Sequence, residues 1–359
     1  TDTEVGAVLL GHLVAQTGDF RTAFAQAVNR FEGAFTVLAI HQDSPNLILA
    51  ARHNSPLVIG FGEGENFLGS DVAAFVEFTH RAAAVGQDQM VAITPEGVTV
   101  TDFIGNPAPI EEFEIAWDAS ASDKGGWPSF MAKEITENPD AVANTVRGRV
   151  TDTSVDIPEL ATLGADTIKN TQRIILIACG TASYAGQVAA YAIEQWVRIP
   201  VEVQLSHEFR YRDPILDRHT LVIAISQSGE TMDTIMALRY AKEQGSRVLA
   251  ICNTQGSTIP RESDAVLYTH AGPEVAVAST KVFLTQIVAV YVFALFFAQV
   301  RGNMYGEEIQ HLIAQVADMP QKVDLVLDTV EPVRALAREY VNAKSVLFIG
   351  RHVGYPVAL

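Results

Sequence analysis

Five short apolar runs, separated by helix-like segments, most constrain how the middle of this chain can fold. Short runs with few polar residues are typical of strands that are buried on both faces. Their alternation with helical segments favours right-handed strand–helix–strand crossovers. The sequence therefore predicts an α/β fold with a doubly wound parallel sheet from about residue 158 onward. The predicted strands lie near residues 173–178, 201–205, 220–225, 247–251 and 265–269.

Two of these runs end in turns that carry hydroxyl groups. Ile174 to Ala178 leads into Cys179-Gly-Thr181, and Leu221 to Ile225 leads into Ser226-Gln-Ser-Gly-Glu-Thr231. Ligands bind at the carboxyl ends of parallel strands, and the N–H groups of the following helix N-termini attract phosphate. No lysine or arginine adjoins the second turn, which argues against the nucleotide hydrolysis of a P-loop. The two turns together predict a phosphate site, and the alternative is a solvated helix cap formed by Ser228 or Thr231.

Net charge and cysteine content exclude several classes of protein. The 359 residues carry a formal net charge of −17, which argues against nucleic acid or an acidic membrane as the main partner. The two cysteines, Cys179 and Cys252, follow predicted strands in apolar surroundings. This pattern indicates reduced thiols in a cytoplasmic protein rather than a disulfide framework.

One apolar segment, Val282 to Val300, is about long enough to cross a bilayer. Thr285 and Gln286 interrupt it near one end and Gln299 near the other. We therefore expect a helix buried in a domain core or a subunit interface, with no membrane association. The same segment favours a homodimer or a packed lobe.

The first hundred residues follow a different pattern. Two helical segments precede strand-like runs near residues 34–40, 47–51, 57–59, 67–68 and 90–93. Segregation of helices from strands predicts an α+β domain rather than a parallel α/β unit. We expect this domain over residues 1–104, a linker with leading helices over 105–157, the parallel-sheet lobe over 158–304, and a further segment over 305–359.

The last of these segments contains a repeat of the central pattern. After a helical stretch over residues 306–340, Lys344 to Gly354 has the same strand-to-glycine form as residues 173–180. It predicts the first strand of a second α/β unit. A lone strand cannot bury its apolar faces, and the chain opens at Thr1 rather than at methionine. We therefore expect a fragment, or the ordered part, of a longer chain.

Six motifs, in order along the chain, resemble the first sugar-isomerase (SIS) lobe of the glutamine–fructose-6-phosphate aminotransferase family. They are Cys179-Gly-Thr, Glu208-Phe-Arg-Tyr-Arg212, Ser226-Gln-Ser-Gly-Glu-Thr, Ala250-Ile-Cys-Asn253, Arg261-Glu-Ser-Asp264 and Val277-Ala-Ser-Thr-Lys281.

The resemblance continues on both sides of the lobe. Thr1 to Glu4, Asn54 to Leu57 and Glu65 to Asp71 are similar to the latter half of the family's class II glutaminase domain, which has the α+β N-terminal-nucleophile fold. Gly350-Arg351 and Tyr355-Pro356 are similar to the start of its second SIS lobe.

The resemblance implies the conversion of fructose 6-phosphate and glutamine to glucosamine 6-phosphate and glutamate, without a metal or organic cofactor. It also implies one residue for glutamine, Asp2, which would bind the substrate's ammonium group; the alternative is a first-turn helix acid. Ala182 stands where many relatives have a phosphate-binding serine, and neighbouring Ser183 need not point the same way. The implied sugar-phosphate residues are Thr181, Ser226, Gln227, Ser228, Thr231 and Val277.

No catalytic residue is expected within this chain. The family's glutaminase nucleophile is an N-terminal cysteine, and its isomerase bases lie in or beyond the second lobe, so we expect the chain alone to be inactive. Lys281 is expected to cap or pair, and His352 to be structural. The alternative function is a non-catalytic SIS-type sugar-phosphate sensor, but such a regulator should carry a basic helix-turn-helix domain, unlike residues 1–104. A sugar-phosphate isomerase without the ammonia step would leave those residues unexplained.

Overall fold

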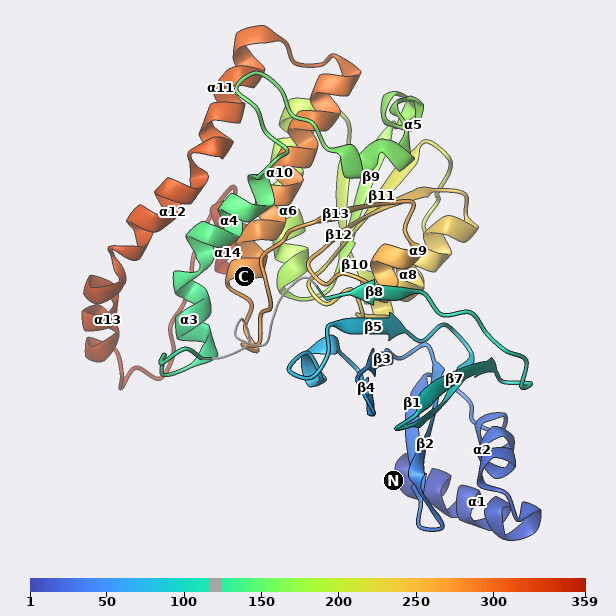
Figure 1. The fold of residues 1–359 in the computed structure, drawn as a ribbon. Coiled ribbons are helices and arrows are strands. Elements are labelled where there is room, and N and C mark those ends of the chain that lie inside the picture. The colour runs from blue at the N-terminus through green and yellow to red at the C-terminus, as the bar shows by residue number, and fades with distance from the viewer. Residues whose placement is uncertain (116–123) are drawn as a thin grey trace. The chain divides into compact units, whose positions relative to one another are not determined.

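The computed structural model describes residues 1–115 and 124–359, which fall into two compact units (Figure 1). The first unit is Thr1–Ala121 and the second is Ser122–Leu359.

The first unit places two helices before two antiparallel sheets, as the α+β pattern predicts. The helices are α1 (Asp2–Thr17) and α2 (Phe20–Val28). The sheets have the strand orders β1-β2-β6-β7 and β4-β3-β5-β8. Their strands are β1 (Phe35–His41), β2 (Ser44–His53), β3 (Val58–Phe61), β4 (Asn66–Gly69), β5 (Arg81–Ala84), β6 (Gln89–Thr94), β7 (Gly97–Asp102) and β8 (Glu112–Glu114), with a 3-10 turn η1 (Val72–Ala74) between β4 and β5.

The first unit continues beyond residue 104, where the sequence analysis ended it. Strand β8 pairs with β5, placing Phe113 opposite Ala82. A three-residue strand carries little local signal, because its conformation depends on a partner about thirty residues away. Residues 105–115 are therefore part of the sheet-bearing unit and not a linker.

The second unit contains a five-stranded parallel sheet of order β10-β9-β11-β12-β13, which confirms the predicted doubly wound fold. Its strands are β9 (Arg173–Ala178), β10 (Val201–Leu205), β11 (Thr220–Ser226), β12 (Arg247–Cys252) and β13 (Ala265–Tyr268). The helices are α3 (Phe130–Thr136), α4 (Asn138–Val146), η3 (Pro158–Leu163), α5 (Ala165–Asn170), α6 (Thr181–Val197), α7 (Ser206–Phe209), α8 (Met232–Glu243), α9 (Thr258–Glu262), α10 (Lys281–Arg301), α11 (Gly306–Ala317), α12 (Met319–Leu327), α13 (Val330–Glu339) and α14 (Gly354–Ala358).

Each face of the parallel sheet has its own hydrophobic core. Along β9, Ile174 and Leu176 pack on one face, while Ile175 and Ile177 pack on the other. Helices α6 and α10 cover the first face and α8 covers the second. Because successive strand residues point to opposite faces, both faces must be apolar, and this explains the uninterrupted apolar runs in the sequence.

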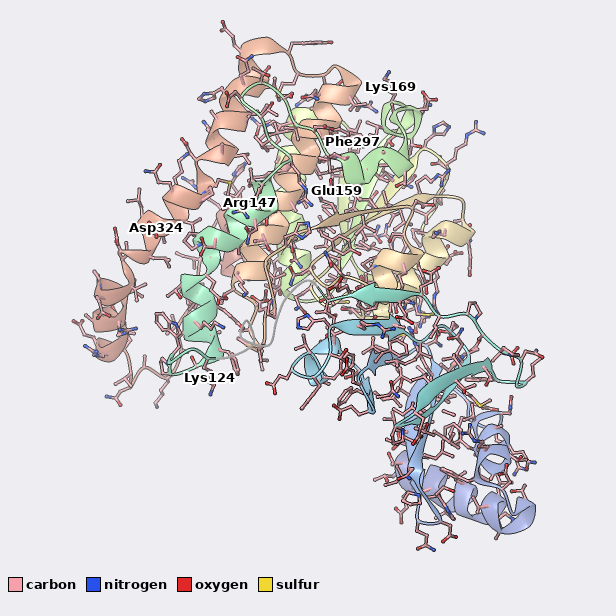
Figure 2. The ribbon with its side chains drawn as sticks, in the orientation of Figure 1. Lys124, Arg147, Glu159, Lys169, Phe297 and Asp324 are labelled. Atoms are coloured by element: carbon pink, nitrogen blue, oxygen red, sulfur yellow. The ribbon has the colours of Figure 1, made fainter. Side chains whose placement is uncertain are left out.

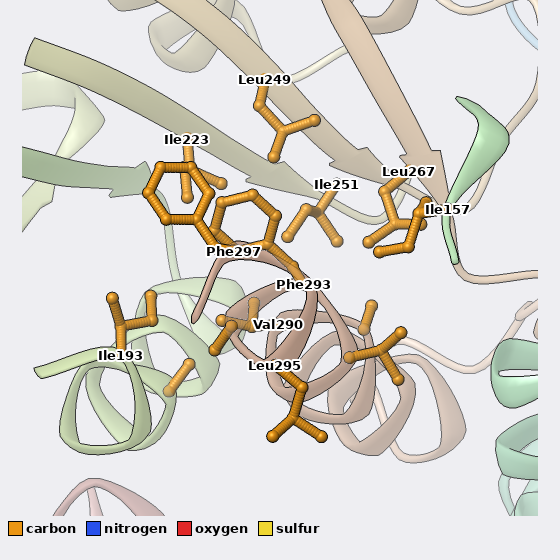
Figure 3. Close-up of a cluster of buried hydrophobic side chains, with 14 of the residues drawn as sticks. Ile157, Ile193, Ile223, Leu249, Ile251, Leu267, Val290, Phe293, Leu295 and Phe297 are labelled. Atoms are coloured by element: carbon orange, nitrogen blue, oxygen red, sulfur yellow. The ribbon is translucent and has the colours of Figure 1, made fainter. Parts of the chain in front are cut away.

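The apolar segment predicted to be a buried helix is α10. By length and composition this helix could cross a membrane, but 72% of its apolar window is buried inside the protein. Phe293 and Phe297 face the strand residues Ile223, Leu249 and Ile251 in the core (Figure 3). The interpretation as a core helix is therefore confirmed.

The segment before the sheet is integrated into the second unit. Arg149, which is 3% exposed, forms an ion pair with Glu159 at 2.6 Å between Nη2 and Oε1 (Glu159 is labelled in Figure 2). In addition, the Thr145 hydroxyl donates to the carbonyl of Thr269 at 2.6 Å, at the end of β13. Helix α4 is thus fixed to the sheet rather than forming a free linker.

The strand predicted within residues 344–354 does not form. Residues 345–351 make no β-pairing within the described chain, and the side chains of Val346 to Ile349 are 66–86% exposed. A strand needs a neighbour to pair its N–H and C=O groups, and none of the described segments supplies one. The helical stretch before it is present as α11 to α13, and the His352 ring contacts Tyr191, with centroids 4.5 Å apart.

Replacing a core aromatic on α10 tests this architecture. Phe293 is fully buried, so Phe293→Ala should lower the free energy of unfolding by about 3–5 kcal/mol through lost contacts and a residual cavity. The matched control is Phe348→Ala, whose side chain is 73% exposed and whose loss should cost no more than about 0.5 kcal/mol. Denaturant titrations followed by circular dichroism measure both, and equal losses would contradict the assigned core.

Candidate functional site

The two hydroxyl-bearing turns leave the sheet side by side. Strand β9 pairs with β11 in parallel register, with Ile177 beside Ala224, so both strands end at the same edge. The first turn leads into α6 and the second into α8. The N-terminal N–H groups of two helices thus lie at the same edge of the sheet.

Glycine is required in the second turn. Gly229 has φ of 68°, in the left-handed region, and a Cβ there would lie 2.0 Å from Ser257 Oγ. Any side chain would therefore clash with the neighbouring loop. This close approach explains why the hydroxyl-rich sequence contains a glycine at this position.

A cavity of about 210 Å³ opens between the turns and the loop before α10. Among the residues that line it are all six that the sequence analysis assigned to sugar phosphate: Thr181, Ser226, Gln227, Ser228, Thr231 and Val277. The structure therefore brings together residues from three separate segments. Their role in binding stays a prediction.

The hydroxyl groups of the second turn shape the turn itself. Ser226 Oγ accepts the N–H of Gly229 at 3.0 Å, and Ser228 Oγ accepts the N–H of Glu230 at 3.2 Å. Ser226 Oγ also lies 3.3 Å from Thr231 Oγ1, where either hydroxyl can donate to the other, so the Ser228 hydroxyl and one of these two keep a proton to donate elsewhere. Thr231 is the N-cap of α8 but makes no side-chain capping bond, and its hydroxyl is instead hydrogen-bonded to Ser226 Oγ at 3.3 Å.

The residues next to Thr181 differ in orientation. Ala182 lines the cavity and contributes no side-chain donor. Ser183 is 1% exposed, and its hydroxyl donates to the carbonyl of Gly180 at 2.6 Å. Ser183 therefore does not replace the donor that Ala182 lacks.

The sequence analysis missed several lining residues, including Glu274, Ser279 and Gln286. Glu274 Oε1 accepts the N–H groups of Thr280 and Val282 at 2.9 and 3.1 Å, and Oε2 accepts the Ser279 hydroxyl at 2.8 Å. The carboxylate thus satisfies the N-terminus of α10. The one available signal was Gln286, a buried amide in an otherwise apolar helix.

The loop before α10 is held from behind by α3 and the start of α4. Glu134, 2% exposed, accepts the N–H groups of Val275 and Ala276 at 2.6 and 3.1 Å. Lys281, also 2% exposed, donates to Glu137 Oε2 at 2.6 Å. Lys281 pairs with a carboxylate, as the sequence analysis expected.

Asp2, the residue assigned to glutamine, lies in the first turn of α1. It is exposed, and its Oδ1 accepts the N–H of Thr3 at 2.8 Å. The helix-acid interpretation describes this local geometry, while its contact with glutamine stays a prediction.

Comparison with known proteins gives these features a context. Residues 167–296 match the SIS domain model. The chain is 60% identical over its whole length to glutamine–fructose-6-phosphate aminotransferase [isomerizing] of Leifsonia xyli subsp. xyli, and 56% identical to that of Streptomyces coelicolor. It spans 58% of the length of each of these two relatives.

A solved structure shows the same likeness. The C-terminal domain of glucosamine-fructose-6-phosphate aminotransferase from Francisella tularensis is 34% identical to this chain, with a TM-score of 0.62. The match covers 66% of each chain. The resemblance predicted from six short motifs is therefore confirmed.

The two cysteines should differ sharply in reactivity. Cys179 lines the cavity and is partly exposed, whereas Cys252 is fully buried, and burial raises the pKa of its thiol to about 12. Because the thiolate is the nucleophile, iodoacetamide should modify Cys179 in the native protein and Cys252 only after unfolding. Peptide mass spectrometry measures this. Equal labelling of both residues in the folded chain would contradict the assigned burial.

Proposed function

We propose that this chain, whose residues 167–296 match an SIS domain and which resembles glutamine–fructose-6-phosphate aminotransferases along its whole length, binds fructose 6-phosphate in the cavity beyond β9 and β11. The observation that carries the proposal is the meeting of three separate segments at one cavity. Each segment contributes residues that the family motifs assign to the sugar phosphate.

The chemistry of the cavity suits a phosphate held by neutral groups. None of the described lining residues is lysine or arginine, so hydroxyls, an amide and helix N-termini would supply the donors. The turn after β11 supplies three hydroxyl groups, and Thr181 supplies one from the turn after β9. Val277 would contact the sugar from the opposite loop.

The full reaction is proposed for the longer protein that the relatives represent. Ring opening and isomerisation of a ketose move protons between carbon atoms and require acid and base groups. The one carboxylate among the described lining residues, Glu274, is bonded to the N-terminus of α10. The cavity would therefore bind the sugar phosphate, with the proton-transfer groups supplied outside it.

The first unit would contribute to glutamine use. This unit, including residues 105–115 as well as 1–104, would be the latter half of a class II glutaminase domain, with Asp2 binding the substrate's ammonium group. The ammonia released there would be added to the ketose phosphate. We also propose that the protein is a cytoplasmic homodimer and that it requires no cofactor.

A sugar-phosphate sensor fits the first unit less well. Helices α1 and α2 together contain one arginine, Arg21, and no lysine, which does not suit the phosphate contacts of a DNA-binding helix pair. The sheets that follow have no place in such a module.

Removing single hydroxyl groups from the second turn tests the binding site. Ser228→Ala and Thr231→Ala should each weaken fructose 6-phosphate binding by about fivefold, the equivalent of one hydrogen bond of about 1 kcal/mol. Isothermal titration calorimetry measures the affinity. The matched control is Ser183→Ala, whose hydroxyl is bonded to Gly180 and should leave the affinity unchanged.

Two results would contradict the proposed binding site. If Ser228→Ala and Thr231→Ala both bind as tightly as the unaltered chain while remaining folded, the phosphate does not bind in this turn. A loss confined to Ser183→Ala would likewise contradict the assignment of the phosphate to the second turn.

A further inference from the structure

A second group of polar side chains lies at the same edge of the sheet. Cys179, His207 and Asp233 each offer one potential metal-ligand atom, and these atoms lie within 4.8 Å of one another. Cys179 follows β9, His207 lies in α7 directly after β10, and Asp233 lies in the first turn of α8 after β11. The three side chains therefore follow three adjacent parallel strands and lie together at the edge of the sheet where these strands end.

We propose that Cys179, His207 and Asp233 form a binding site for a zinc-class divalent ion. The proposal stands on this cluster and does not rest on the proposed function, although Cys179 also lines the cavity proposed for fructose 6-phosphate. Because the family resemblance implies no metal in the sugar chemistry, the ion would be an addition to that reaction and not a requirement for it.

The spacing suits a tetrahedral ion. Zinc binds sulfur at about 2.3 Å and imidazole nitrogen at about 2.0 Å, so a sulfur and a nitrogen on one ion lie about 3.5 Å apart. Cys179 Sγ and His207 Nδ1 are 3.9 Å apart, so a shift of a few tenths of an ångström suffices. Three protein ligands leave a fourth position for water or an anion.

Polar side chains lie next to two of the proposed ligands. Glu208 Oε1 lies 4.0 Å from His207 Nε2, on the ring nitrogen that would not hold the ion. This separation exceeds hydrogen-bond range, and a closer approach would let the carboxylate orient the ring, as carboxylates do for ligating histidines. The Thr234 hydroxyl lies 3.9 Å from Cys179 Sγ and 2.9 Å from Ser206 Oγ, which fixes the thiol's surroundings.

The three side chains of the cluster have few other structural interactions. Asp233 forms no ion pair within residues 1–115 and 124–359, and the His207 side chain is 46% exposed, so solvent reaches the site. Binding would convert the Cys179 thiol to a thiolate and release its proton to water. The thiolate would favour zinc, cobalt or cadmium over magnesium and calcium, which prefer oxygen ligands.

Cobalt titration of the reduced full chain tests this site. A cysteine-ligated tetrahedral Co²⁺ gives a sulfur-to-metal charge-transfer band and intense visible bands, and Zn²⁺ added afterwards should abolish them. Cys179→Ser should remove the charge-transfer band. His207→Ala and Asp233→Asn should each weaken Co²⁺ binding by about tenfold or more. The matched control is Cys252→Ser, which removes the other, fully buried thiol and should leave the spectrum unchanged.

Any of three outcomes would overturn the proposed metal site. Absence of the charge-transfer band in the unaltered chain means that no thiolate site forms. A band that survives Cys179→Ser places the ion elsewhere. A band that disappears in Cys179→Ser but is unaffected by both His207→Ala and Asp233→Asn indicates a lone thiolate adduct. Circular dichroism of every variant establishes that the fold is retained.

Discussion

The parallel pairing of β9 with β11 is the constraint on which the second unit depends. The apolar residues of these strands alternate between two separate cores, so a slip of one residue would exchange the side chains of the two faces. Packing against α10 on one face and α8 on the other therefore fixes the register. The same register brings the turns at Cys179 and Ser226 to one edge, and the cavity follows from it.

The proposed binding of an anion by this acidic chain depends on local groups in the cavity and not on the net charge. The formal net charge is −17, yet Glu274, the one carboxylate among the described lining residues, is bonded to backbone N–H groups. Glu274 accepts from the start of α10, and Glu134 accepts from the loop at Val275. Neutral donors and helix termini then act locally, over a distance at which remote surface charges are screened.

Much of the second unit could be predicted from the sequence because its strands are buried on both faces. The run Ile174 to Ala178 is short and ends before Gly180, which favours a strand over a buried helix, and the turn around Gly229 is rich in hydroxyl groups. Glu134, Glu137 and Glu274 could not be found in this way, because each acts on a backbone or side-chain group that only tertiary packing brings near. The strand expected within residues 344–354 failed for the same reason, since a strand depends on a partner segment.

The central claim is that the turns after β9 and β11 together hold the phosphate of fructose 6-phosphate. Hydrogen exchange with and without this ligand tests it most directly, because a bound phosphate should slow exchange of the amides it accepts. We predict protection concentrated in residues 180–183 and 227–232, with little change in β1 to β8. Protection absent from both turns, in a chain that still binds the ligand, would contradict the account.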